Sequence, residues 1–491
     1  MNASSLPEFS SLKKVHILGV GGTLMGAFAA FLKRRGIHVT GSDLQLYPPM
    51  SDVLQAAGVQ VYSGYRPENL TADAIHPDLV VIGNVIRADN PEAQEAMNGK
   101  YHYSSLPEAM EKLLLEKTTN LVVAGTHGKN TTSSLLAYVL AYCQQKPSYF
   151  IGGVSQDLPQ SFHLSESHDQ AKSFFVLEGD EYDTAFWDKV PKFNHYRPDH
   201  GILTSVEFDH ADIYPDLQAV VRAFQGFVTR IRKGGHLIAC YDYAHVKELA
   251  LNAEVQVLSY GSHPHSQAQF TPSRIRVLED GLTYFDVLDH GKKVEELSLQ
   301  LTGLHNILNA LAVWMECQAI GLDPQKVKLA LKQFRGVKRR QEVRGVIHGV
   351  TVIDDFAHHP TAVRETLRAL RLKYTQHRLI TVFEPRSATS RRKVFQKDYV
   401  EAFQEADQVW IAAPFDQSRI AQDQQFSSEM LVSDLAQKGQ SAHLLTSVDT
   451  GVKEIAKGAA QGDLIAVLSN GGFDGFIPKL LHELELNHED F

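Results

Sequence analysis

One short segment of the chain has the residue types of a phosphate-binding loop. The apolar stretch Leu121–Ala124 leads into the turn Gly125-Thr-His-Gly128, and Lys129 precedes a predicted helix over Thr131–Ala141. In such a turn the backbone N–H groups and the positive end of the helix dipole point at one spot. Because the lysine adds a full positive charge there, the segment predicts that the chain binds a nucleotide triphosphate.

This loop departs from the common pattern G-x-x-x-x-G-K-[ST] at two positions. Val123 stands where the first glycine is usual, which shortens the loop, and Asn130 stands where a hydroxyl would bind Mg²⁺. An Asn carbonyl oxygen can also ligate a hard cation, and Thr131 or Thr132 can supply the hydroxyl instead. The alternative is an ordinary strand–turn–helix connection with a surface lysine. Two glycines, a lysine and threonines at one turn favour the phosphate site.

Two further predicted strands end in side chains that suit a metal ion. Phe175–Leu177 is followed by Glu178, Asp180, Glu181 and Asp183, and Gly201–Thr204 is followed by Glu207, Asp209, His210 and Asp212. The carboxyl ends of parallel strands face the ligand crevice of an α/β sheet, and carboxylate oxygens suit Mg²⁺. A solvated acidic loop is the alternative for the first group. His210 is either a metal ligand or a structural histidine, and these residues alone favour the structural role.

A second glycine-rich turn lies near the N-terminus. The predicted strand Val15–Leu18 leads into Gly19-Val-Gly21-Gly22, and Asp43 follows at the end of the next strand. This spacing is similar to a dinucleotide-binding fingerprint with its ribose-binding acid, although Asp43 is alternatively a simple turn residue. Because a triphosphate-type turn follows downstream, we expect the first site to hold a nucleotide-linked substrate. A nicotinamide-dependent dehydrogenase is the alternative of a different class.

The second half of the chain contains polar groups that can complete a nucleotide site. Asn306 begins a predicted helix that ends at Ile320, and its amide either reads a purine edge or caps the helix. Further on come Arg339-Arg340 and the cluster Asp354-Asp355-Phe-Ala-His358-His359-Pro360. A double Arg can neutralise a transferring phosphoryl group. The alternative is two surface acids before a helix that starts at a proline.

The length of the chain and its alternation of strands and helices predict three α/β domains. A chain of 491 residues is too long for one core, and a typical size of ~150 residues per domain gives about three. We expect a Rossmann-like N-terminal domain (1–117), a central P-loop ATPase-like domain with a mixed sheet (118–336) and a Rossmann-like C-terminal domain (337–491). Short alternating stretches over 253–301 predict antiparallel strands at one edge of the central sheet. In the C-terminal domain we expect a helix over Lys393–Ala406 among others.

Composition predicts a soluble cytoplasmic protein. The net charge is −9, with 43% hydrophobic and 21% charged residues, so that neither nucleic acid nor an anionic membrane is a favoured partner. The three cysteines are widely spaced and predict no disulfide framework, as in a reducing compartment. The segment Met1–Ser11 is polar and predicts no signal peptide, and no apolar run reaches the ~20 residues of a membrane span. Nothing in the sequence indicates an obligate protein partner.

Taken in their order along the chain, these motifs resemble those of the Mur ligases. The matching motifs are Gly125-Thr-His-Gly-Lys129, Glu178-x-Asp180-Glu181, Asp209-His210-x-Asp212, His305-Asn306-x-x-Asn309-Ala310 and Asp354-Asp355-x-x-His358-His359-Pro360. Mur ligases are ATP-dependent enzymes that join amino acids or peptides to UDP-linked muramic acid. The resemblance covers nearly the whole chain, and it implies ATP and Mg²⁺ as cofactors and an acyl-phosphate intermediate.

Two branches of the family are most similar. One adds L-alanine to UDP-N-acetylmuramate, and the other adds the murein tripeptide L-alanyl-γ-D-glutamyl-meso-diaminopimelate to the same UDP-sugar in cell-wall peptide recycling. Stretches that resemble the second branch are Gly41–Met50, Asp180–Phe186, Glu207–Ile213, Phe383–Ser387 and Ser469–Phe473. The alanine-adding branch would read Gln-Pro-His-Arg where this chain reads Glu384-Pro-Arg386-Ser. We therefore expect the tripeptide as acceptor, with L-alanine as the alternative.

The resemblance also implies roles for individual residues. The implied catalytic residues are Lys129, Glu178, His210 and Arg340, and the implied Mg²⁺ ligands are Asn130, Thr131, Glu178 and His210. ATP would be bound by Gly125, Thr126, His127, Gly128, Lys129, Asn130, Thr131, His305, Asn306, Arg340, Asp355 and His358, and the UDP-sugar by Gly19, Gly21, Gly22, Ser42 and Asp43. We expect Arg386 to bind a carboxylate of the peptide, because the guanidinium fork matches that group. Asn130, where the family has Thr, is a departure from the pattern.

Overall fold

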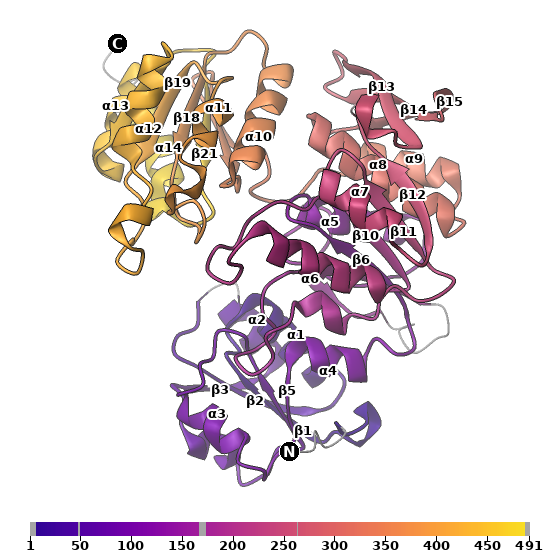
Figure 1. Ribbon diagram of the computed structural model, residues 1–491. Coiled ribbons are helices and arrows are strands. Elements are labelled where there is room, and N and C mark those ends of the chain that lie inside the picture. Colours follow the sequence, from indigo (N-terminus) through magenta and orange to yellow (C-terminus); the bar gives the residue numbers. More distant parts are fainter. Residues whose placement is uncertain (1–5, 48–49, 166–172, 263, 487–491) are drawn as a thin grey trace.

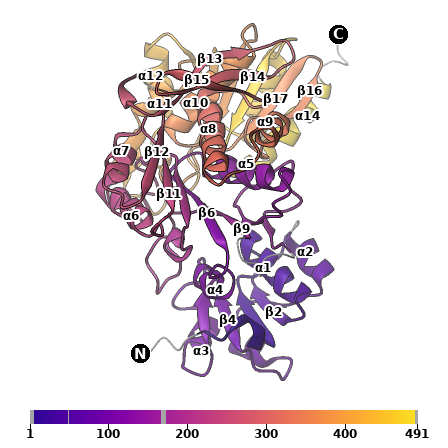
Figure 2. The ribbon, with the colours of Figure 1, turned by 90° about the vertical axis from the view of Figure 1, so that its right-hand side faces the viewer.

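Three sheets with their own helices follow one another along the chain (Figure 1). The computed structural model describes residues 6–47, 50–165, 173–262 and 264–486. The N-terminal domain lies at one end of the molecule, and the central and C-terminal domains lie side by side at the other (Figures 1 and 2). This arrangement confirms the predicted three-domain α/β class; the domain boundaries given above stay predictions.

The N-terminal domain is built on a parallel sheet in the order β3-β2-β1-β4-β5. Its elements are β1 (Lys14–Leu18), α1 (Thr23–Arg34), β2 (His38–Asp43), α2 (Met50–Ala57), β3 (Gln60–Ser63), β4 (Leu79–Ile82), α3 (Pro91–Ala96), β5 (Tyr103–Ser105) and α4 (Leu106–Leu113). Every residue of β1 is buried, as expected for the middle strand of a sheet that helices cover on both faces. The glycine turn after β1 therefore lies at the carboxyl edge of this sheet, next to the end of β2.

The central domain has a ten-stranded mixed sheet in the order β15-β14-β13-β12-β11-β10-β6-β9-β7-β8. Its elements are β6 (Thr119–Ala124), α5 (Lys129–Tyr142), β7 (Ser148–Phe150), β8 (Phe162–His163), β9 (Phe174–Gly179), β10 (His200–Leu203), α6 (Leu217–Thr229), β11 (His236–Cys240), α7 (Ala244–Leu251), β12 (Gln256–Tyr260), β13 (Phe270–Val277), β14 (Thr283–Asp289), β15 (Lys292–Leu299), α8 (Leu304–Ala319) and α9 (Pro324–Gln333). β13, β14 and β15 pair antiparallel at one end of the sheet, as predicted. β9, β6 and β10 are parallel neighbours, so the loops that follow them meet at one edge.

The C-terminal domain has a six-stranded sheet in the order β16-β17-β21-β18-β19-β20, with only β16 antiparallel. Its elements are β16 (Glu342–Ile347), β17 (Val350–Asp355), α10 (Pro360–Lys373), β18 (Leu379–Phe383), α11 (Asp398–Ala402), β19 (Gln408–Ala412), α12 (Ser428–Gln437), β20 (Ser441–Leu445), α13 (Val448–Gly458), β21 (Leu464–Leu468) and α14 (Phe476–Leu486). At the carboxyl end of β17, Asp355 and the following His358 and His359 face the central domain, whereas Asp354 pairs with Arg339 and Arg344 of its own domain.

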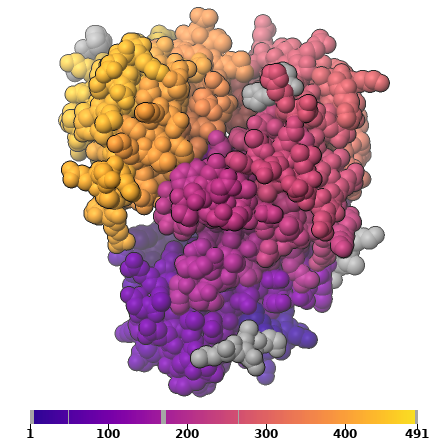
Figure 3. All heavy atoms as spheres, viewed as in Figure 1, coloured from indigo at the N-terminus to yellow at the C-terminus, as the bar shows by residue number. Residues whose placement is uncertain are grey.

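The hydrophobic clusters show which domains share a core. One apolar cluster runs from the N-terminal into the central domain, where Phe28 and Phe31 of α1 pack against Phe162 of β8. The two apolar clusters of the C-terminal domain include no residue of the other domains. In the space-filling view the C-terminal domain touches the central domain and leaves a recess towards the N-terminal one (Figure 3). Hydrogen bonds and single ring contacts, such as that of Phe208 with Phe395, rather than a shared core, therefore join the C-terminal domain to the rest.

Three predicted helices differ from the observed ones. α8 begins at Leu304 with Gly303 as its N-cap, so Asn306 lies inside the helix and does not cap it. α5 begins at Lys129, two positions before the predicted start, because Gly128 in the left-handed region forms its N-cap. The helix expected over Lys393–Ala406 is interrupted: a short 3₁₀ turn over Lys393–Phe395 precedes α11. Between them the buried side chain of Gln396 bonds both backbone groups of Ser427, a tertiary contact that local propensity does not predict. Within the described ranges, no helix combines the length and apolar character needed to cross a bilayer.

Candidate active site

The phosphate-type loop between β6 and α5 is fixed by the strand beside it. Gly125 and Gly128 have φ values of +140° and +85°, which side chains other than glycine rarely adopt. A Cβ on Gly125 would lie 2.2 Å from Oγ1 of Thr204, at the end of β10. The backbone N–H of His127 donates to Oγ of Ser205 over 2.8 Å. The loop is therefore held open in a preformed shape by the adjacent strand.

Lys129 is part of a chain of charges at the start of α5. Its Nζ lies 2.8 Å from Oε2 of Glu181 and donates to the carbonyl of Gly125 over 2.5 Å. Burial alone would lower the pKa of the Lys129 ammonium, but the charges of Glu181 and Asp180 outweigh it and raise the pKa. The lysine is thus a permanent cation whose present counter-ion is a carboxylate. An incoming phosphate would compete for the same charge.

Glu181 also connects Lys129 to His210. Nε2 of His210 lies 2.9 Å from Oε1 of Glu181, and Tyr182 packs on the imidazole with ring centroids 4.2 Å apart. Burial alone would lower the pKa of His210, yet the bond to Glu181 raises it. The sequence reasoning named Glu181 among the acidic residues after β9 but gave it no role. Its place in the Glu-x-Asp-Glu motif was the available signal.

Glu178 ends β9 on the other side of the loop. Its Oε1 accepts from the side-chain amide of Asn130 over 2.6 Å, and its Oε2 accepts from the N–H of Gly152 over 2.8 Å. Burial raises the pKa of Glu178. Asn130, which replaces the usual Thr, therefore orients Glu178. Glu178 does not contact His210 directly, but Glu178 and His210 line the same cavity.

That cavity has a volume of about 300 Å³ and lies between the central and C-terminal domains. Of the residues predicted for ATP, metal or catalysis, all except Gly125 line it: Thr126, His127, Gly128, Lys129, Asn130, Thr131, Glu178, His210, His305, Asn306, Arg340, Asp355 and His358. Tyr243 and Tyr260 also line it, and no motif in the sequence indicated them. The size and the mixed apolar and charged lining suit a nucleotide.

The C-terminal side of the cavity contains two residues of opposite charge. The Arg340 guanidinium lies over the ring of Phe356 at 5.1 Å, while Asp355 accepts from the N–H groups of Gln341 and Ala357 over 2.8 Å each. Burial lowers the pKa of Arg340 and raises that of Asp355. Arg339, by contrast, donates to two backbone carbonyls near β21, at 2.6 and 2.7 Å, outside this cavity. Of the Arg pair, only Arg340 can reach a ligand there.

Another side of the cavity is formed by the start of α8. Burial lowers the pKa of His305 to about 4, so this imidazole is neutral at physiological pH. The side-chain amide of Asn306 donates to the carbonyl of Thr302 over 2.9 Å. One of its two N–H donors is therefore already used in the turn before the helix. His358 also lines the cavity, and burial lowers its pKa.

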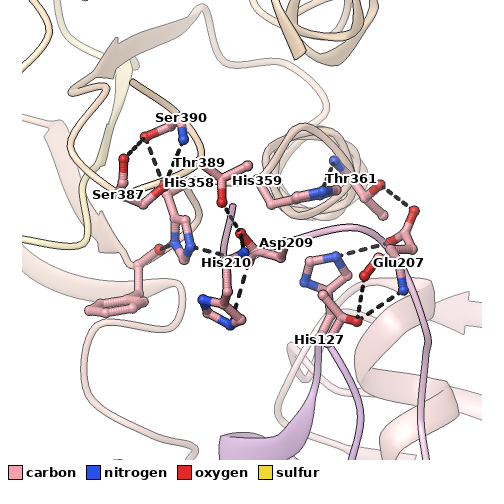
Figure 4. A network of polar contacts seen from close by, with 12 residues as sticks. His127, Glu207, Asp209, His210, His358, His359, Thr361, Ser387, Thr389 and Ser390 are labelled. Atoms are coloured by element: carbon pink, nitrogen blue, oxygen red, sulfur yellow. Dashed lines mark hydrogen bonds and ion pairs between the residues drawn. The ribbon is translucent and has the colours of Figure 1, made fainter. Parts of the chain in front are cut away.

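The segment that follows β10 is held by the C-terminal domain (Figure 4). Thr361 donates to Glu207 over 3.0 Å, and Nε2 of His359 lies 3.2 Å from the carbonyl oxygen of Phe208. Thr389 donates to Oδ1 of Asp209 over 2.6 Å. These three contacts bridge the two domains directly beside His210, so that closure of the domains and the position of His210 are linked.

The carboxylates of this bridging segment are strongly ionised. Burial opposes the charge of Glu207, but His127, whose Nε2 lies 2.9 Å away, outweighs it and holds the pKa of Glu207 at about 2. The neighbouring His210 and His358 charges likewise lower the pKa of Asp209 in spite of burial. Burial lowers the pKa of His359 to about 3. At neutral pH Glu207 and Asp209 are therefore carboxylates that accept hydrogen bonds from Thr361 and Thr389, and His359 is a neutral imidazole.

The glycine turn of the N-terminal domain lies apart from this cavity. The N–H of Gly21 donates to Oδ2 of Asp43 over 2.8 Å, and the N–H of Gly19 donates to the carbonyl of Ser42 over 2.8 Å. The hydroxyl of Ser42 points into the domain and donates to the buried Glu92 over 3.0 Å. Gly19, Gly21, Gly22, Ser42 and Asp43 thus come together at the carboxyl ends of β1 and β2.

Arg386, the predicted peptide contact, follows β18 outside the cavity. Its guanidinium lies over the ring of Phe415 at 3.9 Å, and its Nη1 donates to Glu384 over 3.2 Å. A Cβ on Gly471 would lie 2.2 Å from this side chain, so the small residue leaves room for it. Arg386 is held in place by these neighbours while remaining partly exposed.

The fold and this cavity define a three-domain nucleotide-binding α/β enzyme, and comparison with known proteins gives the family. Three family models match in series: the catalytic domain of the Mur ligase family over residues 14–118, the Mur ligase middle domain over 123–316 and the Mur ligase glutamate ligase domain over 339–471. The chain therefore belongs to the Mur ligase family, whose members are ATP-dependent ligases that form amide bonds.

Within the family, the chain is similar to ligases that act on UDP-N-acetylmuramate. The UDP-N-acetylmuramate–L-alanyl-γ-D-glutamyl-meso-2,6-diaminoheptandioate ligase of Escherichia coli K12 is 38% identical over 473 residues, which cover 96% of this chain and 98% of that protein. The solved murein peptide ligase of Psychrobacter arcticus is 32% identical, with a TM-score of 0.67 over 96% of this chain and 99% of that one. The UDP-N-acetylmuramate–L-alanine ligase of Alkaliphilus metalliredigens is 33% identical over 82% of each chain.

Proposed function

We propose that the protein joins the murein tripeptide L-alanyl-γ-D-glutamyl-meso-diaminopimelate to UDP-N-acetylmuramate at the expense of ATP. The main support is the cavity between the central and C-terminal domains, which is lined by Lys129, Glu178, His210 and Arg340 together. The similarity to the Escherichia coli tripeptide ligase extends over nearly the whole of both chains. Because the reaction uses ATP and a nucleotide-linked sugar, we propose that it takes place in the cytoplasm, in cell-wall peptide recycling.

The first chemical step activates the sugar acid. A carboxylate is a poor electrophile, so one of its oxygens attacks the γ-phosphorus of ATP, the bond to ADP breaks, and an acyl phosphate forms. Negative charge builds up on the transferring phosphoryl group, and catalysis is then mainly positioning and electrostatic stabilisation. Lys129 would neutralise the phosphates from the loop side and Arg340 from the C-terminal side, which gives the two cations separate roles.

The second step forms the amide. The free amine of the tripeptide attacks the carbonyl carbon of the acyl phosphate, and a tetrahedral oxyanion forms. The carbon–oxygen bond to the phosphoryl group then breaks, and phosphate leaves as HPO4²⁻ with the proton that the amine has lost. The glycine turn of the N-terminal domain, with Asp43, would hold the UDP part of the substrate, and Arg386 would hold a carboxylate of the tripeptide. Positioning two bound reactants in this way replaces a bimolecular encounter, which is where much of the rate enhancement would come from.

The residues around the loop fit a divalent cation. Glu178 is a partly buried carboxylate with a raised pKa at the cavity wall. Oε2 of Glu181 has no hydrogen bond within the described part of the chain beyond its ion pair with Lys129. Glu178 and His210, with Asn130 and Thr131 nearby, would hold Mg²⁺. When bound, the ion supplies positive charge to the phosphates and the reacting carboxylate.

A phosphate-release assay tests the proposal. Purified protein with UDP-N-acetylmuramate, ATP and Mg²⁺ is offered L-alanine, the dipeptide, the tripeptide or the tetrapeptide as acceptor. We expect release that depends on the tripeptide, with little response to L-alanine. Release that requires L-alanine and ignores the tripeptide would replace the proposal by the alanine-adding activity, while tight NAD(H) binding without ATP turnover would remove ligation altogether.

A further inference from the structure

A second cluster of ligating side chains lies at the opposite end of the central sheet from the nucleotide cavity. His200 is the first residue of β10 and His236 the first residue of β11, and the two are direct partners on neighbouring parallel strands. Glu316, in the last turn of α8, reaches the same place, with its Oε2 2.9 Å from Nε2 of His236. The cavity lies beyond the other ends of these strands, at Thr204 and Cys240.

The cluster has polar atoms that the protein leaves unsatisfied. Within the described part of the chain, neither the buried Nδ1 of His200 nor the buried Oε1 of Glu316 has a hydrogen-bond partner. Glu316 is only 1% exposed, and no Lys or Arg of the described residues pairs with it. A buried carboxylate and a buried ring nitrogen without partners are uncommon, because both lose their contacts with water on folding.

We propose that His200, His236 and Glu316 form a binding site for a transition-metal ion, with Zn²⁺ the best match. One ligand atom from each residue lies within 4.8 Å of the others. Two imidazoles and a carboxylate are a ligand set for zinc, whereas Mg²⁺ is bound mainly by oxygen ligands. The site has two imidazoles, where the proposed Mg²⁺ site has one among oxygen donors, and it lies elsewhere in the fold. It does not depend on the proposed ligase activity.

The two imidazole rings must reorient before the cluster can hold an ion. The two imidazole rings now stack with centroids 4.1 Å apart and planes at 19°. Tetrahedral zinc with bonds of about 2.0–2.1 Å requires ligand atoms about 3.3 Å apart, so each ring must rotate until its lone pair faces the ion. Binding would replace the contact between Nε2 of His236 and Oε2 of Glu316 by bonds to the ion. Burial lowers the pKa of His200, which favours the neutral ring that a metal ion requires.

A different group of two histidines and a glutamate, His127, Glu207 and His359, lies in the nucleotide cleft. There both ring nitrogens of His359 are already engaged, by the carbonyl of Phe208 at 3.2 Å and the N–H of Thr361 at 3.2 Å. That imidazole would have to give up an existing contact to ligate a metal. The cleft cluster also has two buried atoms without a hydrogen-bond partner among the described residues, Nε2 of His127 and Oε2 of Glu207, but these two face each other as an ion pair at 2.9 Å. We assign the ion to the cluster at the start of β10 and β11 because only the contact of His236 with Glu316 must be given up there.

The test measures zinc binding to the metal-free full-length protein by competition with a chromophoric chelator, with Mg²⁺ in excess. Two variants remove a ligand: His200→Ala, and Glu316→Gln, whose amide oxygen can still accept from His236. Two controls leave the site intact: His290→Ala at an exposed turn and His127→Ala in the cleft. We expect one tight equivalent in the wild type and both controls, weakened at least 100-fold in both ligand variants.

Two further readouts separate a real site from loss of structure. Co²⁺ bound by the wild type should give the visible absorption of a tetrahedral centre, and zinc should raise the thermal unfolding midpoint in proportion to its binding. Within the described part of the chain, Nδ1 of His200 has no hydrogen bond to lose, so His200→Ala tests the site even if Glu316→Gln folds poorly. Equal zinc affinity in the wild type and His200→Ala, or loss of the tight equivalent in His127→Ala instead, would overturn the assignment.

Discussion

The contact between Thr389 and Asp209 gives a sharp test of how the C-terminal domain assists the reaction. Thr389 is 2% exposed, and its hydroxyl donates to the buried carboxylate of Asp209, which precedes His210, while accepting from the N–H of Ala211 over 3.2 Å. Thr389→Val keeps the shape of the side chain and removes both bonds. Thr389→Ser is the matched control, because it keeps the hydroxyl and loses only a methyl group.

The size of the effect follows from the type of bond. A hydrogen bond to a charged acceptor contributes roughly 1.5–3 kcal/mol. Because water reaches Asp209 when the domains separate, we take the lower end, about 1.5 kcal/mol, as the loss from the closed state. Since ~1.4 kcal/mol is a factor of ten in an equilibrium constant, the closed population should fall relative to the open one by about tenfold.

Steady-state kinetics would show this loss. If only the closed state reacts and it is not fully populated in the free enzyme, kcat/KM of Thr389→Val falls by about tenfold for ATP and for the tripeptide alike. Thr389→Ser should stay within threefold of the wild type. The thermal unfolding midpoint of the C-terminal domain should change little in both, because its apolar clusters are intact. A Thr389→Val enzyme with wild-type kcat/KM would refute the link between this bond and closure.

Three further predictions concern single groups. Lys129→Ala should abolish tripeptide-dependent phosphate release without loss of the circular dichroism signal, and more than a tenth of wild-type activity would reject its role at the phosphates. Arg386→Ala should raise the KM for the tripeptide and spare that for ATP; an unchanged tripeptide KM would remove it from the peptide site. The pKa of Glu207 is lowered from 4.5 to about 2, so its contribution to stability is complete above pH 4.5 and is lost as the pH falls towards 2. Acid denaturation curves of the wild type and Glu207→Gln should therefore converge over that range, and a constant difference between them would contradict the assignment.

Much of the site was predictable because its motifs are local. The loop from Gly125 to Lys129 reads as a phosphate site from one strand, one turn and one helix start, and the structure builds those elements in that order. The acids after β9 and the histidine after β10 follow the same rule, since parallel neighbours deliver their carboxyl ends to one edge. Local pattern was insufficient where contacts are long-range: the break before α11 comes from the contact of Gln396 with a distant serine.

The sequence by itself determined which residue types stand at the ends of the strands, and with them the phosphate loop, the acidic clusters and the three α/β units. Only the tertiary structure decided the pairing of those groups: Lys129 with Glu181 rather than Glu178, Arg340 rather than Arg339 at the cavity, and Thr389 against Asp209 across two domains. The physical reason is that strand and turn formation depend on neighbours in the chain. The partner of a buried charge depends instead on which elements pack together, and residues far apart in sequence settle that.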